Sequence, residues 1–183
     1  AFTFSSSDTD VIAVSTTTTA TGSHSVSNTI VGTGTSVITI SQEADANYNA
    51  ATTSYTVTVT KSDPNLSSIA DITKTYGDPD DTVTNTLSGT TAIQYTSSDQ
   101  SVVQIASTSV GTGSQSATLT FTGAGTATVT AALAESDNYN AATVSFTVTV
   151  NKKTPTLSGF DDITKTYGDA DFSLVQPTSR SDG

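Results

Sequence analysis

Hydrophobic and polar residues alternate along much of this 183-residue chain. One such segment covers residues 140–151. There, Phe146, Val148 and Val150 fall on one side of an extended strand, and the threonines between them fall on the other. A period of two predicts a half-buried β-strand. No segment combines a 3.6-residue apolar period with helix caps, so we expect an all-β protein.

The same alternation predicts a β-hairpin upstream. Ala117, Leu119 and Phe121 face inward in its first strand, and residues 127–133 place Ala, Val, Ala and Leu inward in its second. Glycines within residues 123–125 suit the turn between them. Further strands are expected in residues 66–76, 82–87, 91–97 and 102–106. About seven short strands in one stretch are typical of an immunoglobulin-like sandwich.

The chain repeats itself with an offset of 91 residues. The segment Tyr48-Asn-Ala-Ala-Thr-Thr-Ser-Tyr-Thr-Val-Thr-Val returns, with two changes, from Tyr139 (139 − 48 = 91). The segment Asp71-Ile-Thr-Lys-Thr-Tyr-Gly-Asp returns from Asp162 (162 − 71 = 91). Self-similarity at a fixed period is typical of repeat architectures. We therefore expect tandem immunoglobulin-like β-sandwich repeats.

The repeat divides the chain out of phase with the fold. Residues 62–151 contain one complete repeat, residues 1–61 contain the later strands of another without its first two, and residues 152–183 begin a third with its first two strands. A half-sandwich exposes an apolar face and unpaired strand edges. We expect either that residues 152–183 complete the 1–61 portion of a neighbouring copy, or that the chain is an interior fragment of a longer one.

Composition narrows the classes of function. The chain has 17 acidic and 6 basic residues and a formal charge of −11, which repels nucleic acid and anionic membrane surfaces. It has no cysteine, and its single histidine, His24, is expected in a surface loop. Most catalytic and metal-ligand chemistries therefore lack their residues, and we expect no enzyme, no catalytic residue and no cofactor. No apolar run is long enough to span a bilayer.

Four motifs together resemble a known family. They are Tyr95-Thr-Ser-Ser-Asp followed by Val102-Val-Gln-Ile, Gly123-Ala-Gly-Thr-Ala-Thr-Val-Thr-Ala, Asp137-Asn-Tyr-Asn-Ala-Ala, and Lys74-Thr-Tyr-Gly-Asp. With them the chain resembles the tandem bacterial immunoglobulin-like repeats of large surface adhesins and extracellular filament proteins. The resemblance implies an extracellular, cell-surface location and a structural or adhesive role, and it implies no catalytic residue.

Two functions fit this resemblance. In the first, sandwiches stack head to tail on adjacent copies of the same repeat and form a shaft. In the second, loops at one end of a sandwich bind a surface glycan or a protein. An exposed pair of aromatic side chains would indicate the second function, and the candidates are Tyr48, Tyr76 and Tyr139.

Acidic clusters offer the oxygen ligands that Ca²⁺ prefers. The candidate ligands are Asp78, Asp80, Asp81, Asp137, Asn138, Asn140, Asp169 and Asp171. One interpretation is a structural calcium site near a domain junction. The alternative is a solvated acidic surface with Asx turns, which the absence of EF-hand spacing favours.

Two lysines are predicted to point toward the apolar face of their strands. Lys74 shares strand parity with Ile72 and Tyr76, and Lys165 occupies the same place in the next repeat. One interpretation is an isopeptide crosslink from lysine to Asn or Asp, which would stiffen a chain without disulfides. The other is an inward charge on an edge strand, which discourages wrong pairing while the ammonium reaches water.

Overall fold

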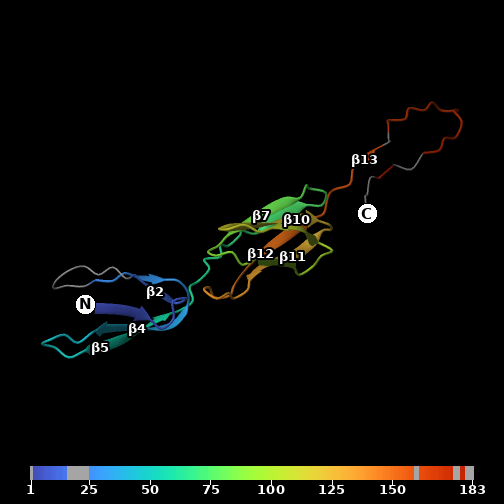
Figure 1. Ribbon diagram of the computed structural model, residues 1–183. Helices are drawn as coiled ribbons and strands as arrows, with labels where there is room; N and C mark the ends of the chain where they lie inside the picture. The colour runs from blue at the N-terminus through green and yellow to red at the C-terminus, as the bar shows by residue number, and fades with distance from the viewer. Residues whose placement is uncertain (1, 16–24, 159–160, 175–177, 180–183) are drawn as a thin grey trace.

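The computed structural model describes residues 2–15, 25–158, 161–174 and 178–179. All regular structure in these residues is β-strand, which confirms the all-β prediction. The strands form an N-terminal unit (β1 to β5) and a central unit (β6 to β12), followed by a C-terminal segment beyond residue 151. These parts follow one another along an elongated molecule (Figure 1). The exact domain boundaries stay predictions.

The central unit is a sandwich of two sheets. Its strands are β6 (Ile72–Thr75), β7 (Asp81–Thr86), β8 (Ile93–Ser97), β9 (Val103–Ser109), β10 (Ser114–Phe121), β11 (Gly125–Leu133) and β12 (Ala142–Asn151). One sheet has the order β7-β10-β9 and the other β6-β12-β11-β8. The first strand of the unit, β6, lies beside the last, β12, and runs parallel to it.

The core of the central unit lies between its two sheets. Sixteen buried hydrophobic side chains form it, and Val103, Leu119, Val129 and Val148 have no exposed surface. Burial alternates along β12 as the sequence pattern predicts, with threonines on the outer face. Each fully buried Val, Leu or Phe side chain contributes about 1.5–3 kcal/mol through the hydrophobic effect. The alternating pattern therefore supplies the apolar side chains that pack between the two sheets.

The N-terminal unit repeats the later strands of the central unit. Its strands are β1 (Phe2–Ser6), β2 (Ile12–Val14), β3 (Asn28–Ile30), β4 (Gly34–Gln42) and β5 (Ala51–Val59). They form the sheets β1-β4-β5 and β2-β3. The start of β1 lies 91 residues before that of β8 (93 − 2 = 91), and β4 stands in the same relation to β11 (125 − 34 = 91). The unit therefore contains equivalents of β8 to β12.

The core of the N-terminal unit is much smaller. Among the described residues only Val11, Ile12 and Ile38 form its buried cluster. Tyr55 is 43% exposed, whereas Phe146, its counterpart in the central unit, is 3% exposed. The described residues of this unit include no strand equivalent to β6 or β7, and β5 pairs only with β4. One edge of β5 and part of the inner face are consequently open.

The C-terminal segment differs from the expectation of two further strands. It contains β13 (Leu157–Ser158) and β14 (Thr178–Ser179), which pair with each other. Residues 161–174, the counterparts of most of the β6–β7 region, form no strand and are exposed. A strand needs a ladder of hydrogen bonds from a neighbour, and no described sheet pairs with this segment.

Two predicted strands also have different bounds. Within the predicted strand 66–76 only Ile72–Thr75 is extended and paired, while Leu66 and Ile69 pack against the core without joining a ladder. Asn65, just before them, has a left-handed φ of 52°. Strand β9 runs on to Ser109, beyond the predicted end at residue 106, because β10 continues to pair with it.

Candidate functional site at the junction of the two units

The N-terminal and central units are joined by backbone pairing. Beyond β5, Ser62 donates its N–H to the carbonyl of Asn138 at 3.0 Å and accepts the N–H of Asn140 at 2.9 Å. These bonds form a parallel bridge between Ser62 and Tyr139. Asn138 to Asn140 belong to the loop between β11 and β12 of the central unit. The chain that leaves the N-terminal unit is therefore bonded through its backbone to a loop of the central unit.

A second attachment comes from the turn between β3 and β4. Thr33 donates its backbone N–H to the Asn138 side-chain oxygen at 3.0 Å, and its hydroxyl donates to the Asp137 carbonyl at 2.6 Å. Gly32 makes room for this turn, because a Cβ there would lie 2.7 Å from the carbonyl oxygen of Asp10. Two separate segments of the N-terminal unit thus hold the same loop, which restricts rotation between the units.

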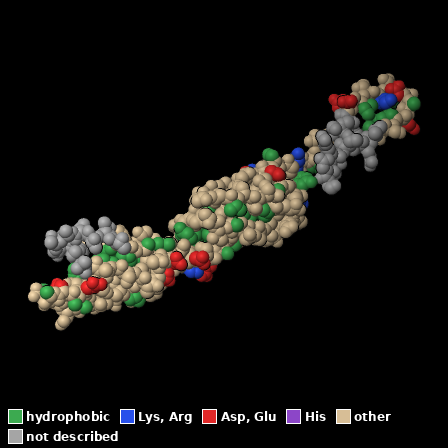
Figure 2. Space-filling view, in the orientation of Figure 1, with side chains coloured by type: hydrophobic (Ala, Val, Ile, Leu, Met, Phe, Trp, Pro, Cys, Tyr) green, Lys and Arg blue, Asp and Glu red, His purple; other side chains and the backbone are tan. Residues whose placement is uncertain are grey.

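An ion pair completes the junction. Lys61 donates to the carboxylate of Glu135, and this hydrogen bond lowers the pKa of Glu135. Acidic side chains gather with a lysine at the boundary between the units in Figure 2. The Glu135 side chain is 62% exposed, and exposed ion pairs contribute little to stability because water and salt screen them.

The calcium candidates fall into separate places. Asp137, Asn138 and Asn140 lie at the junction. Asn138 accepts hydrogen bonds at its side-chain and backbone oxygens, Asp137 accepts one at its backbone carbonyl, and Asn140 donates its backbone N–H. Asp78 accepts the Thr75 N–H at 2.8 Å, and Asp169 accepts the Thr166 N–H at the same distance. These two carboxylates close turns, as the Asx alternative proposes.

The remaining candidates are also dispersed. Asp80 accepts the Thr120 hydroxyl at 3.0 Å, Asp81 pairs with Lys74, and Asp171 is exposed. In the part of the chain that the structure describes, no group of three or more His, Cys, Asp or Glu side chains is arranged to hold a metal ion. The calcium site stays a prediction, and the structure brings these eight residues to no common centre.

Lys74 lies where its strand parity predicts. Strand β6 is the edge of its sheet, and the Lys74 ammonium lies 2.8 Å from a carboxylate oxygen of Asp81 and 5.6 Å from the centre of the Phe121 ring. The hydrogen bond from Lys74 is the main cause that lowers the pKa of Asp81. This arrangement agrees with the inward charge on an edge strand. An isopeptide bond stays a prediction.

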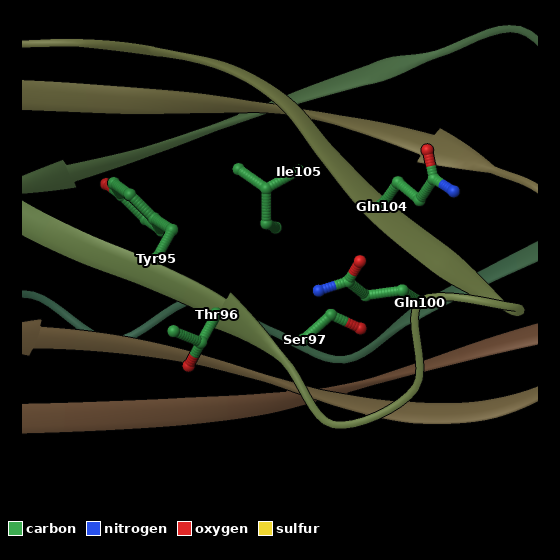
Figure 3. A pocket seen from close by; sticks show the side chains of 6 residues that line it. All are labelled: Tyr95, Thr96, Ser97, Gln100, Gln104 and Ile105. Atoms are coloured by element: carbon green, nitrogen blue, oxygen red, sulfur yellow. The ribbon is translucent and has the colours of Figure 1, made fainter.

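A shallow groove of about 400 Å³ opens on the side of the central sandwich. It lies between β8 and β9, and Tyr95, Ile105, Gln100 and Gln104 line it with Thr96 and Ser97 (Figure 3). The Tyr95 hydroxyl already donates to Asn85 at 2.9 Å and approaches the Gln115 carbonyl at 3.1 Å. The two glutamine carboxamides are the groove's longest polar side chains.

The three candidate tyrosines form no exposed aromatic pair in the described residues. Tyr48 is 70% exposed. Tyr139 packs on Gly89, where a Cβ would lie 3.1 Å from its ring, and Tyr76 packs against the central core. Of these three candidates, Tyr48 exposes most of its side chain to solvent. His24 lies outside the described residues.

Sequence reasoning missed half of the junction. It named Asp137, Asn138 and Asn140 but not Thr33 and Ser62, which bond to them, and it missed the ion pair of Lys61 with Glu135. Thr33 is 105 residues from Asn138 in the chain. No local pattern connects such distant residues, and the repeat offset does not help because Ala124 is the counterpart of Thr33.

Comparison with known proteins identifies no family. No protein-family model and no curated protein matches the chain. Among solved structures, the chain is similar to surface layer protein SbsC, domains 1–6, with 20% identity and a TM-score of 0.46 over 86% of this chain and 21% of that one. Domains 4–9 give 17% identity and a TM-score of 0.43, over 92% and 25%.

A further solved structure, of S-layer protein SbsC domains 4 and 5, shows 21% identity and a TM-score of 0.41 over 82% of this chain and 70% of that one. The chain thus spans about a fifth of the first of these structures. Likenesses at this level of identity and superposition assign neither a family nor a function. No helix in the described residues is long and apolar enough to cross a membrane.

Proposed function

We propose that this chain is a structural repeat of an extracellular bacterial surface filament or adhesin stalk, whose sandwiches stack end to end as a shaft. The observation that carries the proposal is the junction, where Ser62 and Thr33 both hold the loop at Asn138. A flexible linker would allow the sandwiches to rotate independently. Backbone pairing at one point and a side-chain clamp at another favour a fixed angle.

Charge and chemistry agree with a passive, extended role. The net charge of −11 opposes non-specific aggregation of the molecules in solution. The faces of β11 and β12 that point away from the core carry Thr and Ser, which suit exposed strands without catalytic chemistry. A non-enzymatic shaft requires only folded sandwiches and regular junctions.

The alternative is a module that binds a glycan or a protein. The groove with Gln100 and Gln104 is the observation in its favour, since carboxamides can both donate and accept hydrogen bonds. Its counterparts in the N-terminal unit are Thr9 and Ala13, which lack these groups. A binding function would therefore belong to the central unit alone, whereas a shaft uses every repeat.

A distance measurement across the junction tests the shaft. The chain has no cysteine, so Thr52→Cys in β5 and Thr143→Cys in β12 give two unique, exposed sites for spin labels. A narrow distance distribution is expected by double electron–electron resonance. A distribution as broad as that of a flexible linker would overturn the proposal.

A matched pair of variants shows which contact sets the angle. Asn138→Ala removes the side-chain oxygen that accepts the Thr33 N–H and is expected to broaden the distribution. Asn140→Ala keeps the backbone N–H that Asn140 gives to Ser62 and is expected to leave the distribution unchanged. Equal distributions in the two variants would contradict the role of the clamp.

A further inference from the structure

Four strands of the central sandwich have a neighbour on one side only. The orders β7-β10-β9 and β6-β12-β11-β8 leave β6, β7, β8 and β9 at the edges of the two sheets. On the free side of an edge strand, the backbone N–H and C=O groups of every second residue point outward and can pair with another chain. The partners of these outward groups therefore show where the sandwich can accept a further strand.

Three of these edges are largely occupied by the unit itself. At the end of β6, the N–H and C=O of Thr75 bond within a turn. On β7, Thr82 donates its N–H to the Asp81 carboxylate at 3.0 Å, and Thr86 bonds to Ser67 through both of its backbone groups. The ladder of β9 with β10 shifts register, and such an irregularity interrupts the edge. These contacts leave little room for a partner strand.

Strand β8 has an open edge near its C-terminal end. Ser98, just after the strand, donates its N–H to β11 at 2.9 Å, whereas Ile93 donates its N–H away from β11, to the Gln115 side chain at 2.7 Å. The orientation alternates along a strand, so Tyr95 and Ser97 share the orientation of Ile93 and face away from β11. No strand in the described residues pairs with this side of β8. The backbone groups of these two residues are therefore available to a partner.

The open edge of β8 forms one wall of the groove shown in Figure 3. Ile105 of β9 also lines the groove, and its side chain packs against the central core but is only partly buried. Gln100 and Gln104 line the same groove, and each carboxamide can both donate and accept hydrogen bonds. A wall of backbone groups beside an apolar side chain is an arrangement that binds extended peptides by strand addition.

The chemistry of the groove suits a peptide better than a sugar. Tyr95 is 8% exposed, and its hydroxyl is bonded to Asn85 in the core. The one aromatic ring among the residues that line the groove therefore offers little surface to a sugar ring. Extended peptides need no aromatic surface, because backbone hydrogen bonds supply much of their affinity.

Charge limits the kind of peptide. Asp99 lies in the turn between Ser97 and Gln100, which both line the groove. Ser101 donates its hydroxyl to the Asp99 carboxylate at 2.6 Å, and this hydrogen bond lowers the pKa of Asp99, so the carboxylate stays charged. Together with the net charge of −11, this carboxylate repels acidic segments and attracts a basic residue.

We propose that an extended, non-acidic peptide segment of a partner protein adds antiparallel to β8 and pairs with the backbone of Tyr95 and Ser97. Every second side chain of the segment packs on Ile105, and the others point to solvent. A basic residue at its N-terminal end lies beside Asp99, because an antiparallel segment begins where β8 ends. The inference rests on the binding alternative described above, for which it names a peptide as the ligand, and it does not depend on the shaft.

A titration with a synthetic peptide tests the pairing on the full 183-residue chain. The probe is acetyl-Lys-Thr-Val-Thr-Val-Thr-amide, whose valines form the side that faces Ile105. Its addition is expected to shift the backbone amide NMR signals of Tyr95 and Ser97 until they saturate, while the signals of β7 stay unchanged. No shift at β8 up to the solubility limit of the peptide would overturn the proposal.

Two methylated peptides form a matched control. When the valines face Ile105, their N–H groups point toward β8 and those of the threonines point away. N-methylation of both valines is expected to abolish the shifts, whereas N-methylation of two threonines is expected to preserve them. Equal effects of the two methylated peptides would overturn the pairing. If maltohexaose shifted the same amides and the peptide did not, the groove would bind a glycan and the proposal would be wrong.

Substitutions in the protein locate the site. Gln100→Ala removes a carboxamide from the groove and is expected to weaken peptide binding roughly fivefold, as the loss of one hydrogen bond implies. Gln94→Ala changes an exposed glutamine of β8 outside the groove and is expected to leave binding unchanged. Equal affinities of the two variants would contradict this placement. The distance distribution across the junction is measured separately, so failure of the peptide to bind leaves the shaft unaffected.

Discussion

Asn85, Tyr95 and Gln115 form a polar centre in an otherwise apolar core. Asn85 and Gln115 are 0% and 2% exposed. Asn85 accepts the Tyr95 hydroxyl and donates to the Ser67 carbonyl at 2.6 Å, while Gln115 bonds Ile93 and Thr91 at the start of β8. Buried polar groups that are fully hydrogen-bonded help to specify one arrangement of a core. Here they tie the segment before β6 and the start of β8 to the opposite sheet.

Replacement of Asn85 is expected to destabilise the central unit. Asn85→Ala leaves the Tyr95 hydroxyl with the longer contact alone and the Ser67 carbonyl without this donor, at a cost of about 1–3 kcal/mol for buried groups that lose partners. The measurement is the denaturant midpoint, followed by amide NMR signals of the central unit. Thr84→Ala changes the exposed neighbour and is the control. Equal midpoints for the two variants would contradict this role.

Because Tyr95 is buried, we also expect the stability of the central unit to depend on pH in the alkaline range. Burial raises the pKa of Tyr95, because the apolar surroundings penalise the phenolate. The unfolded chain then releases this proton at a lower pH than the folded chain, so stability is full below about pH 10 and falls as the pH rises through the folded pKa. Tyr95→Phe should flatten this fall in unfolding free energy between neutral and alkaline pH. An unchanged slope would show that other groups cause it.

Glycine turns determine how the strands of each sandwich are connected. Gly125 begins β11 with a φ of 155°, and a Cβ there would lie 2.8 Å from a methyl group of Val102. Gly34 has the same relation to Val11, also at 2.8 Å. The two units therefore use one device at the same place, where the strand passes over a buried valine. The turn needs glycine both for its backbone and for this close approach.

Gly125→Ala is expected to cost more than a glycine substitution with open space around it. Overpacking typically costs about 1–3 kcal/mol, in addition to the strain of the unusual φ. Gly113→Ala is the matched control, because Gly113 has a φ of 81° but no atom within 4 Å of a Cβ. Thermal unfolding of both variants separates contact from backbone strain. A smaller loss at Gly125 than at Gly113 would contradict the packing argument.

Elements that face a core were the most predictable from the sequence. The strands around Phe121, Val129 and Phe146 lie where alternation predicts, since burial on one face leaves a period of two. The parallel pairing of β6 with β12 could not be predicted. The hydrophobic pattern predicts one long strand over residues 66–76, and it does not indicate which part of that strand pairs or with which neighbour. Thr33 at the junction was equally hidden, since it acts through its backbone N–H and a hydroxyl that any loop threonine has.

At the scale of the whole molecule, the first and last strands of the central unit lie side by side. The chain enters this unit through β6 and leaves it through β12, and the two strands are parallel. Tension along a shaft would pull them in opposite directions along their lengths. Their hydrogen bonds then share the load in shear and do not open one at a time. The topology therefore suits a module that carries tension.

Removal of one load-bearing bond is expected to lower the force at which the central unit unfolds. Tyr76 donates its N–H to Asn151 at 2.8 Å, and alternate residues of a strand face the same neighbour, so the Lys74 N–H also points toward β12. Lys74→Pro deletes that N–H together with the salt bridge to Asp81 and the contact with Phe121, whereas Lys74→Ala deletes the two side-chain contacts and keeps the N–H. Single-molecule pulling on the two ends of the chain compares the unfolding forces of the two variants.

The proline variant should unfold at a clearly lower force than the alanine variant, because forced unfolding follows the unfolding barrier and the lost bond lies in the ladder that must rupture first. Equal forces would place the mechanical barrier elsewhere in the sandwich, and the antiparallel ladder between β11 and β12 would then be the next to examine.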